Sequence, residues 1–268
     1  MTLIQADQPA EKETPVAPYD AMAPHYEAFV GDAQAMRYGE WLGGLIGMAA
    51  DAGVRVGTAL DVGCGTGRSL AALRAAGFTA SGVDPSPKMM EIARERLGDD
   101  VPLHVGGLPD LPPGSAVDLV TAFNDIVNCV GTSLLGRAIA AMAARVAPGG
   151  MLLFDSNGPL TFSSFFGATF CRTAPGLFLV WQSLGPCEDN GHRADLHAFT
   201  ADPARPGAWT RSVSHHLQHL HPHEAVLDAL AAAGLELVSV HGQRDSGPRD
   251  PFFDEALHTK RIYLAKRP

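Results

Sequence analysis

The stretch from Thr58 to Leu70, TALDVGCGTGRSL, constrains this chain more than any other. A short apolar run typical of a buried strand is followed by a turn with Gly63, Gly65 and Gly67, and then by a helical pattern. Glycine adopts positive φ readily and lets a ligand come close to the backbone, because it has no Cβ. The turn therefore predicts a site where a flat polar ligand lies against the peptide groups.

The spacing of these glycines narrows the class of ligand. It is G-x-G-x-G with Asp61 two residues before the first glycine, whereas the dinucleotide fingerprint is G-x-G-x-x-G. A second acid, Asp84, follows the next apolar run, where a carboxylate can accept hydrogen bonds from both hydroxyls of a ribose and would repel a 2′-phosphate. The two features together predict a nucleoside site, and a strand-to-helix turn without a ligand is the alternative.

The segments DVGCGTG and GVDPSPKMM, at this spacing, resemble motifs I and II of the class I S-adenosylmethionine-dependent methyltransferases. The resemblance extends over residues 19–265 and is loose across residues 159–220. It implies an α/β fold with a doubly wound, Rossmann-like sheet of seven strands, and S-adenosyl-L-methionine as the cofactor. The residues assigned to the cofactor in these motifs and after the third strand are Asp61, Gly63, Cys64, Gly65, Gly67, Asp84, Pro85, Met89, Gly107 and Leu108.

One position in this set departs from the family pattern. Family members often carry an acid after the third strand, which binds the adenine amino group, and this chain has Gly107 there. The resemblance therefore leaves adenine recognition to the backbone of Leu108 or to the side chain of Asp110.

Two helices are expected before the first strand, over residues 20–29 and 33–50, because apolar residues recur there at helical spacing. The pattern Y-D-x-x-A-x-x-Y, from Tyr19 to Tyr26, resembles the N-terminal signature of small-molecule methyltransferases. It implies a lid in which a tyrosine closes over the methionine end of the cofactor. Trp41, on the second helix, is a candidate for the substrate site, and the alternative is that it packs in the core.

The apolar run at residues 117–122 ends in FNDIVNCVG. Ligands of doubly wound sheets bind at the carboxyl ends of the strands, so the residues after this run are expected to line the site: Phe123, Asn124, Asp125 and Asn128. The segment resembles the D-S-L-N-Y segment of small-molecule N- and O-methyltransferases, with Asp125 and Asn128 retained. A histidine that often stands near this asparagine in antibiotic-sugar N-methyltransferases is absent. Alternatively, Asn124 and Asp125 cap the next helix.

Residues 159–220 change to a period of two, interrupted by turn-rich segments, which predicts three antiparallel strands inserted after the fifth strand. These strands would roof the substrate pocket or pair with a second subunit. Their polar side chains would face the pocket or solvent, and His216 and His219 are candidate bases. We expect no metal site, because Pro222 interrupts the alternation that would place four histidines on one face.

Net charge, hydropathy and cysteine positions argue against a nucleic-acid-binding, a membrane-spanning and a disulfide-linked protein. The net charge of −9 argues against nucleic acid or an anionic membrane as the main partner. No apolar run reaches the roughly 18 residues of a membrane span. The four scattered cysteines fit a reducing compartment, and Cys64 is expected to be a packing residue rather than a nucleophile. We therefore expect a cytoplasmic protein with a small-molecule substrate, and a homodimer is left open.

The same patterns divide the chain into five parts. We expect a mobile tail, lid helices, a cofactor-binding core, inserted strands and the C-terminal part of the core, over residues 1–18, 19–56, 57–158, 159–220 and 221–268. The tail is expected to be mobile because it is aperiodic and polar. The 268 residues suffice for one large domain with an insertion.

Methyl transfer from a sulfonium is an in-line displacement, in which a protein aligns the reactants, excludes water and keeps the acceptor unprotonated. The candidate groups, in order of expected closeness to the methyl group, are Asp125, His216, His219 and Tyr19. We predict a methyltransferase that acts on nitrogen or oxygen of a small molecule. The alternatives are a non-catalytic module that binds the cofactor, and a nicotinamide dehydrogenase, which the glycine spacing disfavours.

We predict that Asp84→Ala abolishes the uptake of adenosylhomocysteine, because the ribose hydroxyls lose their carboxylate acceptor. Equilibrium dialysis of the variant beside the unsubstituted chain measures this directly. Uptake that survives the substitution, or no uptake by the unsubstituted chain, would contradict the nucleoside site.

Overall fold

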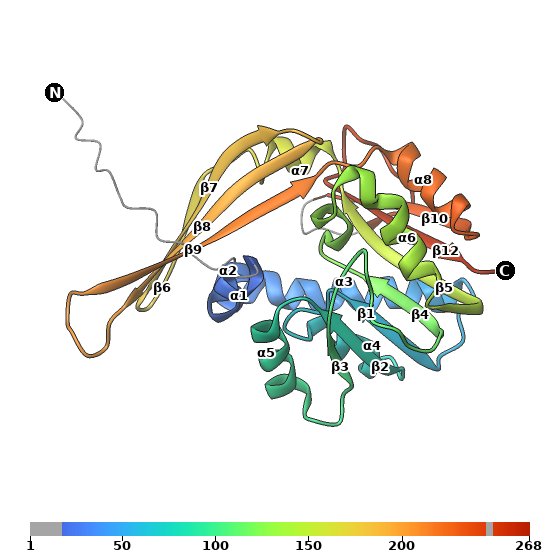
Figure 1. Cartoon of the computed structure of the whole chain (residues 1–268), viewed down its shortest axis with the longest axis horizontal. Helices are drawn as coiled ribbons and strands as arrows, with labels where there is room; N and C mark the ends of the chain where they lie inside the picture. Colours follow the sequence, from blue (N-terminus) through green and yellow to red (C-terminus); the bar gives the residue numbers. More distant parts are fainter. Residues whose placement is uncertain (1–17, 245–248) are drawn as a thin grey trace.

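Figure 1 shows the computed structural model of the chain, which describes residues 18–244 and 249–268, without the side chains of residues 18 and 32–38. A large mixed sheet carries helices on both faces, and a second, antiparallel sheet curves away from it. The mobile tail expected for residues 1–18 lies outside the described residues, except for its last residue, which begins the first helix.

The large sheet has eight strands in the order β11-β10-β12-β5-β4-β1-β2-β3. Strands β1 to β5 run parallel, and β12 is antiparallel to both of its neighbours, β5 and β10. The bounds are β1 (Thr58–Val62), β2 (Thr79–Asp84), β3 (Leu103–Val105), β4 (Val117–Ala122), β5 (Val146–Asn157), β10 (Glu236–Gln243), β11 (Arg249–Asp250) and β12 (Lys260–Lys266). This arrangement confirms the doubly wound sheet that the sequence predicts.

The sheet has one strand more than the seven predicted. The additional strand, β11, consists of Arg249 and Asp250, which pair with Gln243 and Gly242 at the edge of the sheet. Sequence periodicity missed this strand, because two residues are too few to form an alternating pattern.

Two groups of helices cover the two faces of the large sheet (Figure 1). Helices α3, α4 and α5 pack on one face, and α6 and α8 cover the other. The bounds are α3 (Asp32–Asp51), α4 (Arg68–Ala75), α5 (Pro87–Leu97), α6 (Leu135–Ala143) and α8 (His223–Ala232). On α6, the spacing of Leu135, Ile139 and Met142 turns all three toward the sheet. No helix within residues 18–244 and 249–268 combines the length and the apolar character needed to cross a membrane.

The N-terminal segment is broken where the sequence predicts a continuous helix over residues 20–29. Its pieces are α1 (Pro18–Met22), the 3-10 turn η1 (Ala23–His25) and α2 (Tyr26–Val30). Pro24 lies in η1 and explains the break, because proline has no N–H to donate and clashes with the preceding turn of a helix. The second predicted helix, over residues 33–50, is confirmed by α3.

The segment between β5 and α8 contains a short helix and four antiparallel strands, where the sequence predicts three strands. The bounds are α7 (Pro159–Ser163), β6 (Phe170–Ala174), β7 (Leu177–Cys187), β8 (Gly191–Ala201) and β9 (Trp209–His219). The strands follow one another in the order β6-β7-β8-β9. The sequence missed β6 because this edge strand is largely exposed and carries no apolar alternation.

One face of this antiparallel sheet is turned toward the N-terminal helices (Figure 1). The side chains of Leu179, Trp181 and Leu196 are buried on that face and form one apolar cluster with Met22 and Phe162. Helix α1 contacts both β9 and α5. The N-terminal helices therefore lie between the two sheets.

We predict that Phe154→Ala lowers the free energy of unfolding by about 3–5 kcal/mol, because the ring of Phe154 is fully buried. This ring, on β5, stacks on Tyr263 of β12 with a centroid distance of 5.0 Å. Urea unfolding measures the loss. Val238→Ala, at an exposed position of β10, is the control, and an equal loss in the two variants would contradict this core packing.

Candidate active site

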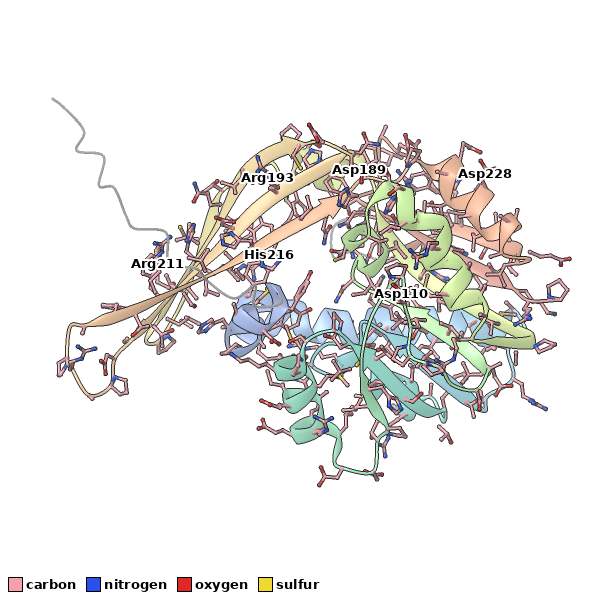
Figure 2. The ribbon with its side chains drawn as sticks, viewed as in Figure 1. Asp110, Asp189, Arg193, Arg211, His216 and Asp228 are labelled. Carbon is pink, nitrogen blue, oxygen red and sulfur yellow. The ribbon has the colours of Figure 1, made fainter. Side chains whose placement is uncertain are left out.

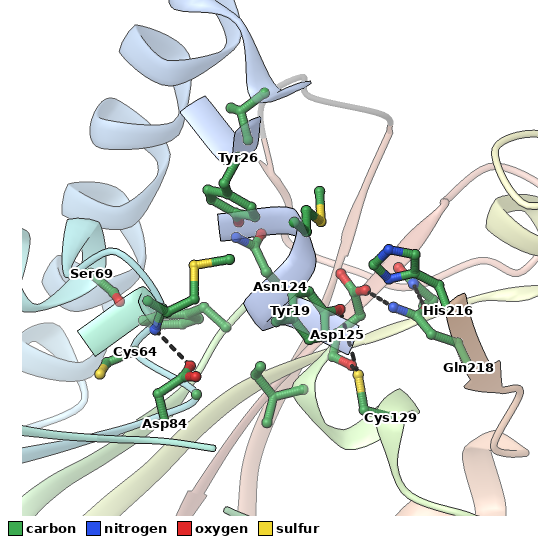
Figure 3. Close-up of a pocket in the computed structure, with 18 of the residues that line it drawn as sticks. Tyr19, Tyr26, Cys64, Ser69, Asp84, Asn124, Asp125, Cys129, His216 and Gln218 are labelled. Atoms are coloured by element: carbon green, nitrogen blue, oxygen red, sulfur yellow. Dashed lines mark hydrogen bonds between the residues drawn. The ribbon is translucent and has the colours of Figure 1, made fainter. Parts of the chain in front are cut away.

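A cavity of about 540 Å³ opens at the carboxyl ends of β1, β2 and β4 and is closed by α1, α2 and the antiparallel sheet (Figure 3). The strand order reverses between β1 and β4, which is where doubly wound sheets bind ligands. The predicted residues that line the cavity are Tyr19, Tyr26, Gly63, Cys64, Gly65, Asp84, Pro85, Met89, Gly107, Leu108, Phe123, Asn124, Asp125 and His216. The predicted residues that do not line it are Trp41, Asp61, Gly67, Asn128 and His219.

The glycine turn presents bare backbone to this cavity. Gly63 and Gly65 have φ values of 71° and 52°, and the N–H of Gly63 donates to the Val83 carbonyl at 2.7 Å. A Cβ at Gly65 would meet no atom within 4 Å, so the space beside this residue is open to a ligand. A Cβ at Gly63 would collide with the side chain of Ile126, which packs directly against this glycine and also lines the cavity.

Asp84 ends β2 beside this turn, and its carboxylate is held by two backbone N–H groups. Oδ2 accepts from Gly65 and Oδ1 from Ser86, both at 2.8 Å (Figure 3). Burial raises the pKa of Asp84, although the two N–H groups oppose the rise. Each oxygen keeps a lone pair for a further donor. A carboxylate held in this way beside open backbone fits the two hydroxyls of a nucleoside.

Asp61 and Gly67, which the family resemblance assigns to the cofactor, lie behind the turn. The carboxylate of Asp61 accepts from the hydroxyls of Ser69 and Thr121, the latter at 2.7 Å, and so joins α4 to β1 and β4. Burial raises the pKa of Asp61 to about 6. Gly67 has a φ of 80° and precedes α4, where a Cβ would meet Leu97. Both residues shape the turn rather than the cavity wall.

Asn128 and His219 also lie outside the cavity, since they bond to each other and to neighbouring backbone. Asn128 donates from Nδ2 to the His219 carbonyl and accepts at Oδ1 from the Asn157 N–H, both at 2.8 Å. The ring Nδ1 of His219 lies 2.9 Å from the carbonyl of Asp189. These bonds join β5 and β9 to η2 (Ile126–Cys129), the 3-10 turn after β4.

Two carboxylates fasten the N-terminal helices to α4 and α5 beside the glycine turn. The first is Asp20 of α1, which accepts from the Ser86 hydroxyl and, at 3.2 Å, from the Lys88 N–H. Ser86 is the N-cap of α5 and in turn accepts from the Met89 N–H at 3.1 Å. Helix α1 is therefore bonded to the first turn of α5.

The second carboxylate is Glu27 of α2, which bridges to α4 and α5. It forms ion pairs with Arg68 and, at 2.7 Å, with Arg96, and it accepts from the Thr66 hydroxyl at 3.0 Å. Burial alone would raise the pKa of Glu27, but the hydrogen bonds from Arg68 and Arg96 outweigh it and lower the pKa to about 2. The helices expected to form a lid are thus closed onto the glycine turn.

The turn after β4 is held by a buried carboxylate on β5. Asn124 and Asp125 both have positive φ, 63° and 59°. Their N–H groups donate to Asp155 at 3.0 and 2.6 Å. The side chain of neither residue caps η2, so the alternative of a helix cap is not what the structure shows.

The carboxylate of Asp125 faces the cavity, and side chains from two distant strands hold it (Figure 3). Lys260 of β12 donates to Oδ1 at 3.0 Å and to Asp155 at 3.2 Å. Gln218 of β9 donates from Nε2 to Oδ2. Burial alone would lower the pKa of Lys260, but the carboxylates of Asp155 and Asp125 raise it above its ordinary value.

Aromatic side chains from α2, from the segment after α7 and from β7 form one wall of the cavity. Phe29, Phe165 and Trp181 pack together with centroid distances between 5.0 and 6.4 Å. Trp41, a predicted substrate residue, lies on α3 outside the cavity lining and packs its ring edge-on against Phe123 with a centroid distance of 5.7 Å. Its position in the core is the alternative that the sequence left open.

Two of the predicted catalytic groups meet beside this aromatic wall. The ring of His216 lies 5.4 Å from that of Tyr19 and 5.2 Å from that of Trp181, on the side of β9 that faces α1 (Figure 2). Burial lowers the pKa of His216 to about 4, so its imidazole is neutral near pH 7. Cys129, burial and Asp125 raise the pKa of Tyr19 well above its ordinary value, so its hydroxyl stays protonated and is no base.

Four residues that the motifs assign to the cofactor at and after the ends of β2 and β3 also line the cavity, namely Pro85, Met89, Gly107 and Leu108. The carboxylate of Asp110, the other candidate for adenine recognition, is mostly exposed and pairs with Arg137 at 2.7 Å outside the cavity. No group of three His, Cys, Asp or Glu side chains that could hold a metal occurs in the described part of the chain.

Sequence reasoning missed four residues in or next to the cavity around Asp125, namely Asp155, Trp181, Gln218 and Lys260. Asp155 follows the apolar part of β5, and this position at a strand end was a usable signal. Trp181 belongs to a recognisable alternating strand. No pattern in the sequence marks Gln218 or Lys260, because each meets Asp125 only through the folding of a distant strand.

Asp84 can accept the hydroxyls of a nucleoside beside the open backbone of Gly65, and Asp125 faces the same cavity near an aromatic wall. This combination is typical of an α/β enzyme that binds a nucleoside cofactor next to a small acceptor. Comparison with known proteins agrees. The family described as "Methyltransferase domain" matches residues 59–150. A dTDP-3-amino-3,6-dideoxy-alpha-D-glucopyranose N,N-dimethyltransferase of Streptomyces fradiae is 32% identical over 185 residues, which cover 68% of this chain and 71% of that protein.

Further relatives have the same activity class. A dTDP-3-amino-3,4,6-trideoxy-alpha-D-glucopyranose N,N-dimethyltransferase of Streptomyces venezuelae is 30% identical over 185 residues, covering 68% of this chain and 77% of that protein. The sugar N-methyltransferase KedS8 from a Streptoalloteichus species superimposes with a TM-score of 0.70 at 25% identity, over 100% of this chain and 99% of that one. This chain belongs to the class I S-adenosylmethionine-dependent methyltransferases that act on small molecules. It is an enzyme, and S-adenosylmethionine is its cofactor.

We predict that the stabilising contribution of Glu27 disappears in acid. The pKa of Glu27 is about 2 in the folded chain, compared with about 4.3 for an unperturbed glutamate. Because the folded pKa is the lower one, the contribution is present above pH 4.3 and is lost as the pH falls toward 2. Urea unfolding of Glu27→Gln and the unsubstituted chain should therefore converge between these pH values.

At pH 7, the free energies of unfolding of Glu27→Gln and the unsubstituted chain should differ by about 1 kcal/mol or less, because Glu27 is 41% exposed and solvent screens its ion pairs. Glu95→Gln, at an exposed position of α5, is the matched control. A gap between Glu27→Gln and the unsubstituted chain that stays constant from pH 6 to pH 2 would contradict the ion pairs.

Proposed function

We propose that this enzyme methylates the amino group of a sugar carried by a nucleotide, as the names of the Streptomyces relatives state for those proteins. The observation that carries the proposal is Asp125, a carboxylate that faces the cavity at the end of β4 beside an aromatic wall. A carboxylate attracts an amine and orients its N–H groups by accepting hydrogen bonds, whereas it repels a phenolate.

The proposed cofactor site follows from the residues that line the cavity around the glycine turn. Asp84 would accept the ribose hydroxyls, the Gly65 backbone would lie against the nucleoside, and Met89 and Leu108 would contact the adenine. Tyr26, held over the cavity by α2, would cover the methionine end. When bound, S-adenosylmethionine supplies an electrophilic methyl group on a positively charged sulfur.

The proposed work of the chain is alignment and the exclusion of water. Asp125 would accept a hydrogen bond from the acceptor amine and so direct the nitrogen lone pair toward the glycine turn. His216 is neutral near pH 7, since its pKa is about 4, and it adds no positive charge that would repel an amine. The protonated hydroxyl of Tyr19 supplies a donor beside the same wall.

We further propose that residues 57–158 and 221–268 act as the cofactor-binding core, with residues 19–56 as the lid and 159–220 as the roof of the acceptor site. The net charge of −9 supports a small-molecule partner rather than nucleic acid, and the scattered cysteines support a cytoplasmic location. The antiparallel sheet would be the contact of a homodimer, if one forms.

The experiment that tests this function is a transfer assay with methyl-labelled S-adenosylmethionine. The acceptors are dTDP-3-amino-3,6-dideoxyglucose, its 3-hydroxy counterpart and a set of phenols. We expect label in the amine alone, because only the amine presents a nitrogen to Asp125. Transfer to phenols without transfer to any amine would reject the proposed acceptor.

We predict that Asp125→Asn lowers kcat with the best amine by about 100-fold, because the amide keeps the size of the side chain but removes its charge. The uptake of adenosylhomocysteine should be unchanged. Asp228→Asn is the control, since Asp228 lies on α8 away from the cavity (Figure 2). A kcat that does not respond to Asp125→Asn would mean that this carboxylate does not orient the acceptor.

A further inference from the structure

Lys260 connects the last strand of the sheet to the acceptor side of the cavity. It begins β12, and its side chain is 18% exposed and lines the cavity. Its ammonium lies between two carboxylates, 3.0 Å from Asp125 and 3.2 Å from Asp155. Asp155 is completely buried, so it depends on bonds within the protein.

We propose that Lys260 is a positioning residue for methyl transfer, which holds the Asp125 carboxylate turned toward the acceptor amine. The inference rests on the proposed function, because it assigns to Lys260 a role that acts through Asp125. Nothing in the motifs of the chain or in the comparisons assigns a role to this residue.

The geometry supports orientation of the Asp125 carboxylate. Lys260 holds Oδ1 and Gln218 holds Oδ2, so a rotation of the carboxylate would break both bonds. The backbone N–H of Asp125 is fixed separately by Asp155. Lys260 also donates to Asp155. The same ammonium therefore holds both the side chain of Asp125 and the carboxylate that binds the Asp125 N–H. A misplacement of about 1 Å in such a group can cost roughly 100-fold in rate.

The charges support the same role. Lys260 forms ion pairs with both Asp125 and Asp155, so one ammonium lies between two carboxyl groups. Without Lys260, the two carboxylates would repel each other and one of them would take up a proton. The other titratable groups that face Asp125 from the elements around it are Tyr19 of α1, Tyr26 of α2, Cys129 of η2 and His216 of β9. None of these is a cation near pH 7, so none replaces Lys260.

Arg68 also lines the cavity with a positive charge, but it forms its ion pair with a carboxylate other than Asp125. Arg68 pairs with Glu27 on the cofactor side. Within residues 18–244 and 249–268, Lys260 is therefore the positive side chain that the structure bonds to Asp125.

The test compares Lys260→Gln and Lys260→Arg with the unsubstituted enzyme, using the best amine from the transfer assay. Glutamine keeps a polar side chain without the charge, whereas arginine keeps the charge. We expect Lys260→Gln to lower kcat by roughly 100-fold and to move the acidic limb of the kcat profile to higher pH, because a protonated carboxyl no longer orients the amine. Lys260→Arg should restore most of kcat and the original profile.

Lys266→Gln is the matched control, because Lys266 lies at the other end of β12 and does not line the cavity. Uptake of adenosylhomocysteine shows that each variant is folded. If Lys260→Gln retains kcat and its pH profile, or if it loses activity with no movement of the profile and no rescue by arginine, the proposal is overturned. Should Lys260→Gln fail to take up adenosylhomocysteine, Gln218→Leu tests the same orientation from the other oxygen, and an unchanged kcat there overturns the proposal.

These outcomes are distinct from a failure of the proposed function. If the unsubstituted enzyme methylates no amine, the function itself is rejected before any variant is compared. If it methylates an amine and Asp125→Asn is slow while Lys260→Gln is not, the function stands and the role of Lys260 is rejected.

Discussion

The buried carboxylate of Asp155 accepts the N–H groups of Asn124 and Asp125, and this pair of hydrogen bonds fixes the turn that ends β4. Both residues of the turn adopt positive φ, which costs energy for any residue with a side chain. The bonds to Asp155 compensate that cost inside the protein, where an unpaired N–H would also be unfavourable. Because Asp155 belongs to the neighbouring strand, the parallel pairing of β4 and β5 decides where the carboxylate of Asp125 lies.

The two halves of the cavity are built in different ways. The half around the glycine turn comes from adjacent parts of the chain, since the Gly65 N–H donates to Asp84 across two neighbouring parallel strands. The half around Asp125 gathers residues from β9, β12 and the turn after β4, and residues of the N-terminal helices line the same cavity. Residues close together in the sequence therefore form the half around the glycine turn, whereas residues far apart in the sequence form the half around Asp125.

The residues expected at the site fall into two groups, those that line the cavity and those that turn away from it. Glycines, prolines and apolar residues near motifs I and II line the cavity as the sequence indicates. Asp61 and Asn128 belong to the right segments but turn away from the cavity, because they bond hydroxyl and backbone groups behind it, and Gly67 lies at the start of α4 outside the lining. His219 was expected beside the substrate, but the end of β9 directs its ring to the Asp189 carbonyl. Motif membership placed these residues in the right segment but did not settle their orientation.

The sequence by itself determined the order of the core elements, the turn at Gly65 and the acid at Asp84, because these depend on periodicity, on the freedom of glycine and on short spacings. It did not determine the eighth strand or the fourth strand of the insertion, which lack an apolar pattern. Only the tertiary structure decided that Lys260 and Gln218 hold Asp125, 135 and 93 positions away along the chain. Such contacts leave no local signal, since they depend on how the closing strand and the inserted strand pack against the turn after β4.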